Sequence, residues 1–384
     1  MQLIRSGAAS SRSDLARLSG LAASTVSLRV NQLIDHGYLR EDGSDASRGG
    51  RRPRRLRIED HGGKARIAAL ELGAHHARLG VADLSGRLLR SEEVAIPITD
   101  GPEIVLADLH RRIVTLTDKE PEQRPALRAL SLAIPAPVDY ATGRIVLPSR
   151  MPGWHMADVK AEMRRHTDIP VLVDNDANLM ALGEHAIRGS NAQHLLVAKI
   201  GTGIGMGIVS AGRLHRGARG GAGDISHVPV DGKSVLPCTC GNTSCLESVA
   251  GGGAVVELLR QQGLSVANPM EVVELARSGN IAATEALREA GHTIGTVLAV
   301  VVDFFNPDVL ALGGALAAAE PLVAAVRSVL YERCLPLSSE TITVQTCATG
   351  LDAALQGGVQ LALDHLLGSD EVDRRLSISQ IKTS

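Results

Sequence analysis

The sequence predicts an α/β protein in which a small N-terminal winged helix-turn-helix domain precedes a larger body. Residues 1–66 hold thirteen of the chain's 40 Lys and Arg residues but only seven of its 42 Asp and Glu residues, so a basic segment precedes an acidic remainder. Apolar strands alternate with amphipathic helices through that remainder, as in α/β folds. We expect an N-terminal domain at 1–62, a body at 63–368 and a C-terminal tail at 369–384, with only the basic domain meeting a polyanion.

The composition sets further limits. The chain has 384 residues, which suggests two or three domains, and only 2% of them are aromatic, so Leu, Val, Ile and Ala must fill the cores. The segment Met1–Gly7 has no long apolar run, and the longest apolar stretch, Thr296–Val302, is broken by Asp303 and is too short to cross a membrane. We therefore expect a cytoplasmic protein without a membrane partner, where clustered cysteines bind metal more often than they form disulfides.

Two short helices are predicted in the N-terminal domain. The first covers Asp14–Ser19, with Ser11 or Ser13 as its cap and Gly20 at its end, and the second opens at Ala23–Thr25. Two helices joined by a short turn match a helix-turn-helix. The expected buried face of the second helix comprises Val26, Leu28, Val30, Leu33 and Ile34. The residues expected to face the DNA major groove are Ser24, Thr25, Ser27 and Arg29.

An arginine-rich hairpin is predicted next. Tyr38–Arg40 is expected to form a short strand, and 47-SRGGRRPRRLRIE-59 carries six arginines around the flexible pair Gly49–Gly50. The alternation of Leu56 and Ile58 suggests the return strand. The arginines expected to contact phosphate or to enter a minor groove are Arg48, Arg51 and Arg52. The alternative is a solvated loop beside an ordinary helix pair, but the order of the elements is that of a winged helix, which favours DNA binding.

Alternating elements are predicted through the body. The expected strands are Ala65–Leu72, Ala77–Val81, Leu127–Ile134, Val171–Val173, Leu195–Ile200 and Gly205–Val209. The expected helices are Ile104–Thr117, Met156–His166, Ala177–Arg188, Ala254–Gln262, Ala282–Phe304 and Leu322–Cys334. Glycine-rich turns occur in 201-GTGIGMGIV-209 and 310-LALGGALA-317, although such turns alone are a weak indication of phosphate binding.

The segment 227-HVPVDGKSVLPCTCGNTSC-245 contains one histidine and three of the chain's five cysteines. One imidazole and three thiolates complete a tetrahedral coordination shell, which is typical of structural zinc. The predicted Zn²⁺ ligands are His227, Cys238, Cys240 and Cys245. The alternatives are a disulfide, a redox centre or cysteines packed as small apolar residues, but the proline, glycine and asparagine between the ligands favour a tight loop. Cys334 and Cys347 lie in apolar surroundings and are expected to be inert core residues.

Four stretches taken together resemble the ROK family, which contains bacterial sugar kinases and sugar-responsive repressors. They are 172-LVDNDANLMALGEH-185, 201-GTGIGMGIV-209, 223-GDISHVPV-230 and 236-LPCTCGNTSCLESVAG-251. The resemblance covers nearly the whole chain, to about Leu367. It implies a two-lobed actin/hexokinase-like, ribonuclease H-like body with a sugar bound in the cleft between the lobes. It also implies a zinc loop whose ligands follow the order found here.

The resemblance implies which residues contact the sugar. They are Asn175, Asp176, Asp224, His227 and Glu247. Carboxylates suit sugar hydroxyls because they are charged hydrogen-bond acceptors, and zinc on one nitrogen of His227 would leave the other N–H free as a donor. For the carboxylates the alternative is solvation or helix capping, since Asp176 stands where it could cap the helix at Ala177–Arg188.

A kinase of this family would use Asp176 as its general base. The family's first phosphate loop reads close to Asp-x-Gly-Gly-Thr-Lys, whereas the aligned stretch here is 71-ELGAHHA-77. The departures are Glu71, Ala74, His75 and His76. The second loop, Gly201–Gly203, is kept. Because positioning and charge neutralisation supply most of the catalysis of phosphoryl transfer, the loss of one loop predicts a non-catalytic kinase homologue.

These features predict a DNA-binding transcriptional regulator of carbohydrate metabolism, a repressor whose affinity for a double-stranded operator changes when a sugar or sugar derivative binds. Two N-terminal domains in a homodimer or homotetramer would fit a palindromic operator. The alternative is an active or bifunctional sugar kinase, while a zinc hydrolase is disfavoured because four protein ligands leave no open position. The pocket departs from the family at Ala136, Arg150, Asp224 and Ser226, which leaves open a different sugar or none.

Overall fold

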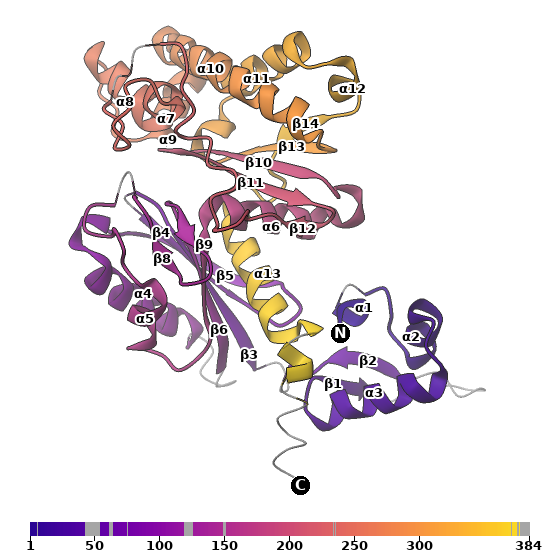
Figure 1. Ribbon diagram of the computed structural model, residues 1–384. Coiled ribbons are helices and arrows are strands. Elements are labelled where there is room, and N and C mark those ends of the chain that lie inside the picture. Colours follow the sequence, from indigo (N-terminus) through magenta and orange to yellow (C-terminus); the bar gives the residue numbers. More distant parts are fainter. Residues whose placement is uncertain are drawn as a thin grey trace.

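The computed structural model shows an N-terminal domain joined to a body of two lobes (Figure 1). It describes residues 1–5, 7–42, 54–60, 64–74, 76–118, 126–148, 151–232, 234, 236–369, 371–374 and 376, apart from the side chains of Gln2 and Ser190. The positions singled out from the sequence that lie outside these ranges are Arg48, Arg51, Arg52, His75 and Arg150. None of the helices within the described ranges combines the length and the apolar character needed to cross a membrane.

The N-terminal domain is a helix-turn-helix followed by a pair of antiparallel strands. Its elements are α1 (Gln2–Arg5), α2 (Arg12–Ser19), α3 (Ala23–Asp35), β1 (Leu39–Asp42) and β2 (Arg55–Ile58). The Ser11 side chain accepts a hydrogen bond from the Asp14 backbone N–H and so caps α2. Gly20 ends this helix with a φ of 69°, a left-handed conformation that favours glycine. The predicted helix pair and strand pair are therefore confirmed.

The buried face of α3 is narrower than predicted. Val26 and Val30, four residues apart, are buried in a small core with Leu39 and Leu56 from the two strands. Leu28 is exposed instead, because two residues turn a helix by about 200° and place it on the opposite side. This exposed side of α3 is therefore the side that is free to meet a ligand.

The first lobe is built on a five-stranded sheet with the order β5-β4-β3-β6-β9. Its elements are β3 (Ala65–Leu72), β4 (His76–Ala82), β5 (Leu88–Ala95), α4 (Pro102–Thr117), β6 (Ala126–Ile134), the hairpin β7 (Val138–Asp139) and β8 (Arg144–Ile145), α5 (Val159–Arg164) and β9 (Val171–Asn175). Strands β3, β6 and β9 are parallel, whereas β4 and β5 are antiparallel to their neighbours. Apolar side chains of the sheet pack against α4 and α5 on one face.

The second lobe repeats this strand arrangement in the order β12-β11-β10-β13-β14. Its strands are β10 (Leu195–Ile200), β11 (Ile204–Ser210), β12 (Arg213–Leu214), β13 (Val309–Gly313) and β14 (Thr343–Thr346). Its outer helices are α7 (Leu246–Ala250), α8 (Gly252–Gln261), α9 (Pro269–Arg277), α10 (Ile281–Phe305), α11 (Glu320–Arg333) and α12 (Pro336–Ser339). Each lobe thus joins three antiparallel strands to two parallel ones, which confirms the predicted duplicated ribonuclease H-like architecture.

Two helices, α6 (Asp176–Arg188) and α13 (Ala353–Leu367), lie between the sheets and cross each other closely (Figure 1). A Cβ on Gly183 of α6 would lie 2.3 Å from the Ala353 carbonyl oxygen, and a Cβ on Gly357 of α13 would lie 1.7 Å from the Leu179 carbonyl oxygen. Only glycine allows such an approach at these positions.

The C-terminal part of α13 reaches the N-terminal domain (Figure 1). Met1, Tyr38 and Ile58 pack against an apolar cluster to which α13 contributes Leu363 and Leu366. Asp364 of the same helix forms an ion pair with Arg5. The helix that crosses α6 between the lobes therefore also supports the N-terminal domain.

One predicted helix is shorter in the structure, and one long helix was not predicted. The helix expected over Met156–His166 covers only Val159–Arg164, because Met156 has a φ of 62° and the Asp158 side chain caps the helix later, by accepting a hydrogen bond from the Ala161 N–H. The helix α13 was not predicted, since its only polar side is a narrow stripe of Gln356, Gln360 and Asp364 and it contains adjacent glycines, which usually break a helix.

Candidate metal centre and effector cleft

The four predicted zinc ligands come together in the segment between β12 and α7. The ligand atoms of His227, Cys238, Cys240 and Cys245 all lie within 4.8 Å of one another. The Cys238 sulfur is 3.3 Å from His227 Nδ1 and 3.3 Å from the Cys240 sulfur, which is 3.4 Å from the Cys245 sulfur. A tetrahedral zinc ion with Zn–S bonds of about 2.3 Å holds its ligands at comparable separations. The donor set and its spacing therefore fit Zn²⁺.

A backbone hydrogen bond closes the candidate metal-binding segment, residues 227–245, near its two ends. The thiols of the segment differ in their acidity. The Val230 N–H donates a hydrogen bond to the Ser244 carbonyl oxygen at 2.8 Å. Burial raises the pKa of the Cys245 thiol to about 12, whereas a hydrogen bond from the Asn242 backbone is the main cause that lowers the pKa of Cys240 to about 7. A bound divalent cation would stabilise the thiolate form of each ligand.

The predicted effector residues approach one another around β11. A Cβ on Gly207 of β11 would lie 2.2 Å from the Ala177 carbonyl oxygen, so the first turn of α6 packs directly on this strand. A Cβ on Gly223 would lie 2.0 Å from the Met206 carbonyl oxygen, so the segment that leads to Asp224 packs beside the same strand. Glycines in β11 and in the segment after it thus allow three parts of the chain to converge.

Several of these side chains are already engaged within the protein. Glu247 is buried, and its carboxylate accepts a hydrogen bond of 3.1 Å from the backbone N–H that begins β11. Asn175 caps α6 and also donates to the Ala136 carbonyl oxygen at 3.1 Å. The exposed Asp224 accepts a hydrogen bond from the Ser226 hydroxyl. Asn175, and not Asp176, is therefore the capping residue, while Ser226 orients Asp224.

Asp176 has a buried partner that sequence reasoning missed. One carboxylate oxygen of Asp176 accepts a hydrogen bond from the Ala177 N–H at 2.7 Å, and the other forms an ion pair with Lys199 of β10. Lys199 Nζ also lies 3.4 Å from Glu71 Oε1 of the first lobe. Burial alone would lower the pKa of Lys199, but the nearby carboxylates of Asp176 and Glu71 raise it overall. The available signal was a lysine inside the apolar run 195-LLVAKI-200, since a buried lysine almost always has a partner.

The two stretches that align with the family's phosphate loops, the first of which was predicted to be degenerate, are engaged by the protein itself. In the first, the Gly73 N–H donates to the His76 carbonyl oxygen at 2.8 Å, and the His76 ring lies where a Cβ on Gly73 would be only 2.6 Å away. In the second, the Gly201 carbonyl oxygen accepts from the Gly252 N–H at 3.0 Å, which joins this turn to the start of α8. The surviving glycines thus have a packing role.

The predicted DNA-contacting residues of α3 lie mainly on its exposed side. Ser24, Thr25 and Arg29 are exposed and Ser27 is half-buried. Arg12 of α2 holds α3 in place, since its guanidinium group donates to the Ser27 carbonyl oxygen at 3.1 Å and to the Asn31 side chain at 2.8 Å. It also forms an ion pair of 2.7 Å with Glu41 of β1. One arginine therefore connects both helices and the first strand.

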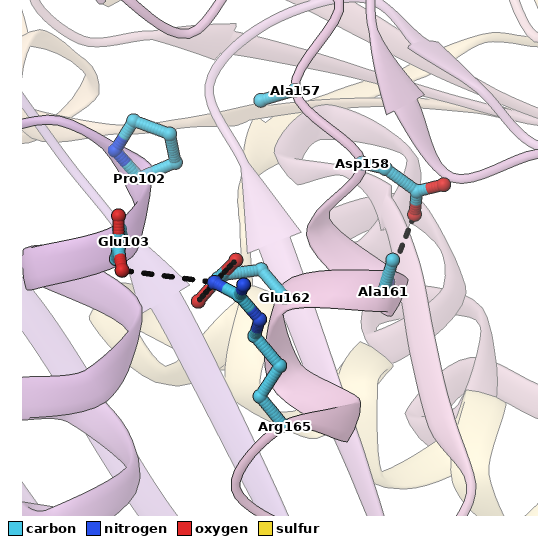
Figure 2. A pocket seen from close by; sticks show the side chains of 7 residues that line it. All are labelled: Pro102, Glu103, Ala157, Asp158, Ala161, Glu162 and Arg165. Carbon is cyan, nitrogen blue, oxygen red and sulfur yellow. Dashed lines mark hydrogen bonds and ion pairs between the residues drawn. The ribbon is translucent and has the colours of Figure 1, made fainter.

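A separate hollow lies on the first lobe between α4 and α5 (Figure 2). Its lining residues are Pro102, Glu103, Ala157, Asp158, Ala161, Glu162 and Arg165. Arg165 forms ion pairs with Glu162 at 3.1 Å and with Glu103 at 3.6 Å across it. None of the predicted site residues lines this hollow, so the hollow is separate from the predicted effector site.

The fold and the site together define a class of protein, a helix-turn-helix regulator whose body has a duplicated, two-lobed sugar-kinase architecture. Comparison with known families then identifies the family to which the chain belongs. The chain belongs to the ROK family, whose model matches residues 67–365, and the IclR helix-turn-helix domain matches residues 1–43.

The relatives include regulators that match nearly the whole chain. The xylose repressor of Bacillus spizizenii is 26% identical over 362 residues, which cover 93% of this chain and 92% of the repressor. The DNA-binding transcriptional dual regulator NagC of Escherichia coli is 28% identical over 338 residues, or 85% and 82% of the two chains. A solved ROK family transcriptional regulator, described as a homologue of the E. coli MLC protein, superposes with a TM-score of 0.81 at 24% identity and 97% coverage of both chains.

The body also resembles catalytic members of the family. The ROK hexokinase of Thermus thermophilus superposes with a TM-score of 0.60 at 29% identity. The match covers 99% of the hexokinase but 78% of this chain. The regulator, by contrast, matches over 97% of this chain, which extends the likeness to the helix-turn-helix.

Proposed function

We propose that this protein is a transcriptional regulator of carbohydrate metabolism, a repressor whose affinity for its operator changes when a sugar binds between the lobes. The observation that carries the proposal is the union of a helix-turn-helix and a ROK body in one chain, since relatives that match both parts are repressors named for xylose or N-acetylglucosamine. Binding to chromosomal DNA would place its action in the bacterial cytoplasm.

The proposed sugar site consists of the residues around β11, namely Asn175, Asp176, Asp224, His227 and Glu247. Their carboxylates supply charged acceptors for sugar hydroxyls. The proposed Zn²⁺ is structural, because His227, Cys238, Cys240 and Cys245 would fill its coordination shell. It would fix the segment that carries Asp224 and His227 next to β11, and so hold the sugar site in shape.

We further propose that the protein does not transfer phosphate. The candidate base, Asp176, is tied to Lys199, and the Gly73 N–H of the first phosphate loop is engaged by the His76 carbonyl oxygen. Phosphoryl transfer depends on a free base and on backbone and cationic groups that hold the phosphates. The alternative function, a sugar kinase with Asp176 as base, draws its support from the likeness of the body to ROK hexokinase.

A homodimer or homotetramer is proposed as the active form. Large apolar side chains are exposed where α10, α11 and α12 meet, and Phe304 is 91% exposed. Val300 and Phe304 lie one turn apart on α10, and Leu335, between α11 and α12, donates its backbone N–H to Asp303 at 3.1 Å. An exposed apolar patch rimmed by polar residues is typical of a protein interface. Two copies would present two α3 helices to a palindromic operator.

The deciding experiment measures DNA binding and catalysis on one preparation. Fluorescence anisotropy with fragments from upstream of the protein's own gene should show binding that changes with at least one of D-xylose, D-glucose and N-acetylglucosamine. Zinc-loaded protein that binds DNA without responding to any sugar would contradict the switch. A parallel assay with ATP-Mg²⁺ and the same sugars tests the alternative, because sugar phosphate formed at about 1 s⁻¹ or faster would show an enzyme.

A further inference from the structure

A buried lysine connects the two lobes at the proposed sugar site. Lys199 belongs to β10 of the second lobe, and its ammonium group lies between the carboxylates of Glu71, on β3 of the first lobe, and Asp176, at the start of α6. The side chains of all three are largely buried, with exposed fractions of 17%, 10% and 7% respectively. These three residues form an interlobe charge cluster with a formal charge of −1.

The cluster lies next to the two stretches that align with the family's phosphate loops. Glu71 begins the stretch that aligns with the first phosphate loop of the family, and Lys199 precedes the second loop, Gly201–Gly203, by two residues. The ammonium group therefore lies where the two loops approach each other. A lysine commonly binds phosphate, but here both neighbouring carboxylates already use its charge.

We infer that the interlobe charge cluster sets the specificity of the effector site: its net negative charge makes the site accept a sugar with a free hydroxyl at Asp176 and exclude the corresponding phosphate ester, while Lys199 positions Asp176. The inference rests on the proposed function and specifies its ligand. Lys199 forms an ion pair with one carboxylate oxygen of Asp176, and a carboxylate paired in this way can accept a hydrogen bond from a hydroxyl group.

A phosphate group at the same position would meet an unfavourable field. A dianion would face the net negative charge of the cluster and would compete with Asp176 and Glu71 for one ammonium group. Asp174, two residues before Asp176, pairs with Arg216 at 2.7 Å, so the charge of this arginine is already balanced. The same argument excludes the phosphates of a nucleotide, so the cluster would keep both the product and the cosubstrate of a kinase out of this site.

The charge of the cluster can be changed in both directions by single substitutions. Glu71→Gln removes one negative charge and leaves a neutral cluster, whereas Lys199→Met removes the cation and leaves two facing carboxylates. Lys199→Arg keeps the charge. If the cluster served only to stabilise the fold, the first two substitutions would weaken the binding of sugar and phosphate ester alike. If it sets specificity, they shift the ratio of the two affinities in opposite directions.

The test is isothermal titration calorimetry of the full-length, zinc-loaded protein with matched pairs, D-glucose with glucose 6-phosphate and N-acetylglucosamine with its 6-phosphate. D-xylose, the sugar that names one group of relatives, is titrated alongside. For the wild type we expect the parent sugar to bind at least about tenfold more tightly than its ester, which corresponds to about 1.4 kcal/mol. The ratio should narrow about tenfold in Glu71→Gln, widen in Lys199→Met and stay near the wild-type value in Lys199→Arg. Thermal unfolding of each variant reports its folding separately.

The outcomes are distinct. A parent sugar that binds more tightly than its ester, with opposite shifts in the two charge-changing variants, supports the inference. A wild-type protein that prefers the phosphate ester, or a Glu71→Gln variant with an unchanged ratio, overturns the inference and leaves the sugar-responsive regulator intact. If neither the paired sugars, nor their esters, nor xylose bind or alter DNA binding, the proposed function fails, and the inference fails with it.

Discussion

Arg5 in the first helix of the N-terminal domain forms an ion pair with Asp364 near the end of α13, where the two charged atoms lie 2.6 Å apart. Helix α13 also packs against α6, whose first residue is Asp176. A chain of packed elements thus connects the proposed sugar site with the DNA-binding domain. Movement of α6 relative to α13 would therefore change the contact between Arg5 and Asp364.

Asp364→Ala should uncouple sugar binding from DNA binding. The ion pair is partly exposed, so its loss should cost about 1 kcal/mol of stability or less. We expect nearly unchanged operator affinity without sugar but a smaller change when sugar is added, measured by fluorescence anisotropy. Asp108→Ala is the control, since it removes ion pairs with Arg111 and Arg112 within α4, away from the N-terminal domain. A full sugar response in Asp364→Ala would contradict this route.

Gly357→Ala should strongly destabilise the body. The added Cβ would lie 1.7 Å from the Leu179 carbonyl oxygen, so α6 and α13 would have to separate. Overpacking of this kind costs about 1–3 kcal/mol or more, and the midpoint of thermal unfolding should fall accordingly. Gly221→Ala is the control, because no other atom lies within 4 Å of the position that its Cβ would take, and its effect should stay within about 0.5 kcal/mol. Equal stability of the two variants would disprove the close crossing.

Zinc removal should expose three reactive thiols and lower the stability of the second lobe. With zinc bound, a thiol reagent at about pH 8 should label few cysteines. After chelation it should label Cys238, Cys240 and, as the segment opens, Cys245. Cys347 should stay unreactive, because burial raises its pKa to about 12 and keeps it protonated well below that pH.

Two cysteine variants provide the control for zinc binding. Metal analysis should find about one zinc per chain in the wild type and in Cys334→Ser, but much less in Cys238→Ser. Cys334 is buried and lies outside the ligand cluster. A Cys238→Ser variant with a full zinc content would refute the proposed ligand set.

Asp176→Asn should abolish sugar binding while DNA binding remains. The substitution keeps the size of the side chain but removes the charge that accepts a hydroxyl hydrogen bond and pairs with Lys199. We expect sugar affinity to fall at least about tenfold, or 1.4 kcal/mol, by calorimetry. Asp168→Asn, an exposed aspartate on the first lobe, should bind sugar as the wild type does. Undiminished sugar affinity in Asp176→Asn would exclude this residue from the site.

Replacing both Arg51 and Arg52 with alanine should weaken binding to every DNA sequence and reduce its salt dependence. Each phosphate contact that is lost lowers the slope of log K against log salt by about 0.9. Arg29→Ala on α3 should instead weaken binding mainly to the operator, because α3 is the proposed recognition helix. Arg17→Ala, an exposed arginine on α2, is the control. An unchanged salt slope in the double variant would argue against the wing.

Much of the architecture was predictable because local signals agreed with one another. Ser11 and Gly20 delimit α2 in the structure as their cap preferences predicted, and the basic composition of 1–66 pointed to DNA. The order of the histidine and three cysteines predicted a metal site, and their ligand atoms do lie together. Each of these signals arises within a short stretch of chain, so periodicity, capping and ligand spacing were enough to find it.

Features that depend on distant packing were decided only by the tertiary structure. The Gly357–Gly358 pair predicts a break in isolation, yet it lies inside α13, where α6 comes too close for a side chain at Gly357 and Ser131 of β6 comes too close for one at Gly358. Lys199 received no role from the sequence, because its partners Glu71 and Asp176 are 128 and 23 residues away and only the fold brings them against its ammonium group. The sequence alone predicted the domains' character and the proposed metal ligands, because those properties are local. The helix crossing and the charge state of the cleft arise from contacts between lobes, and such contacts exist only after the chain has folded.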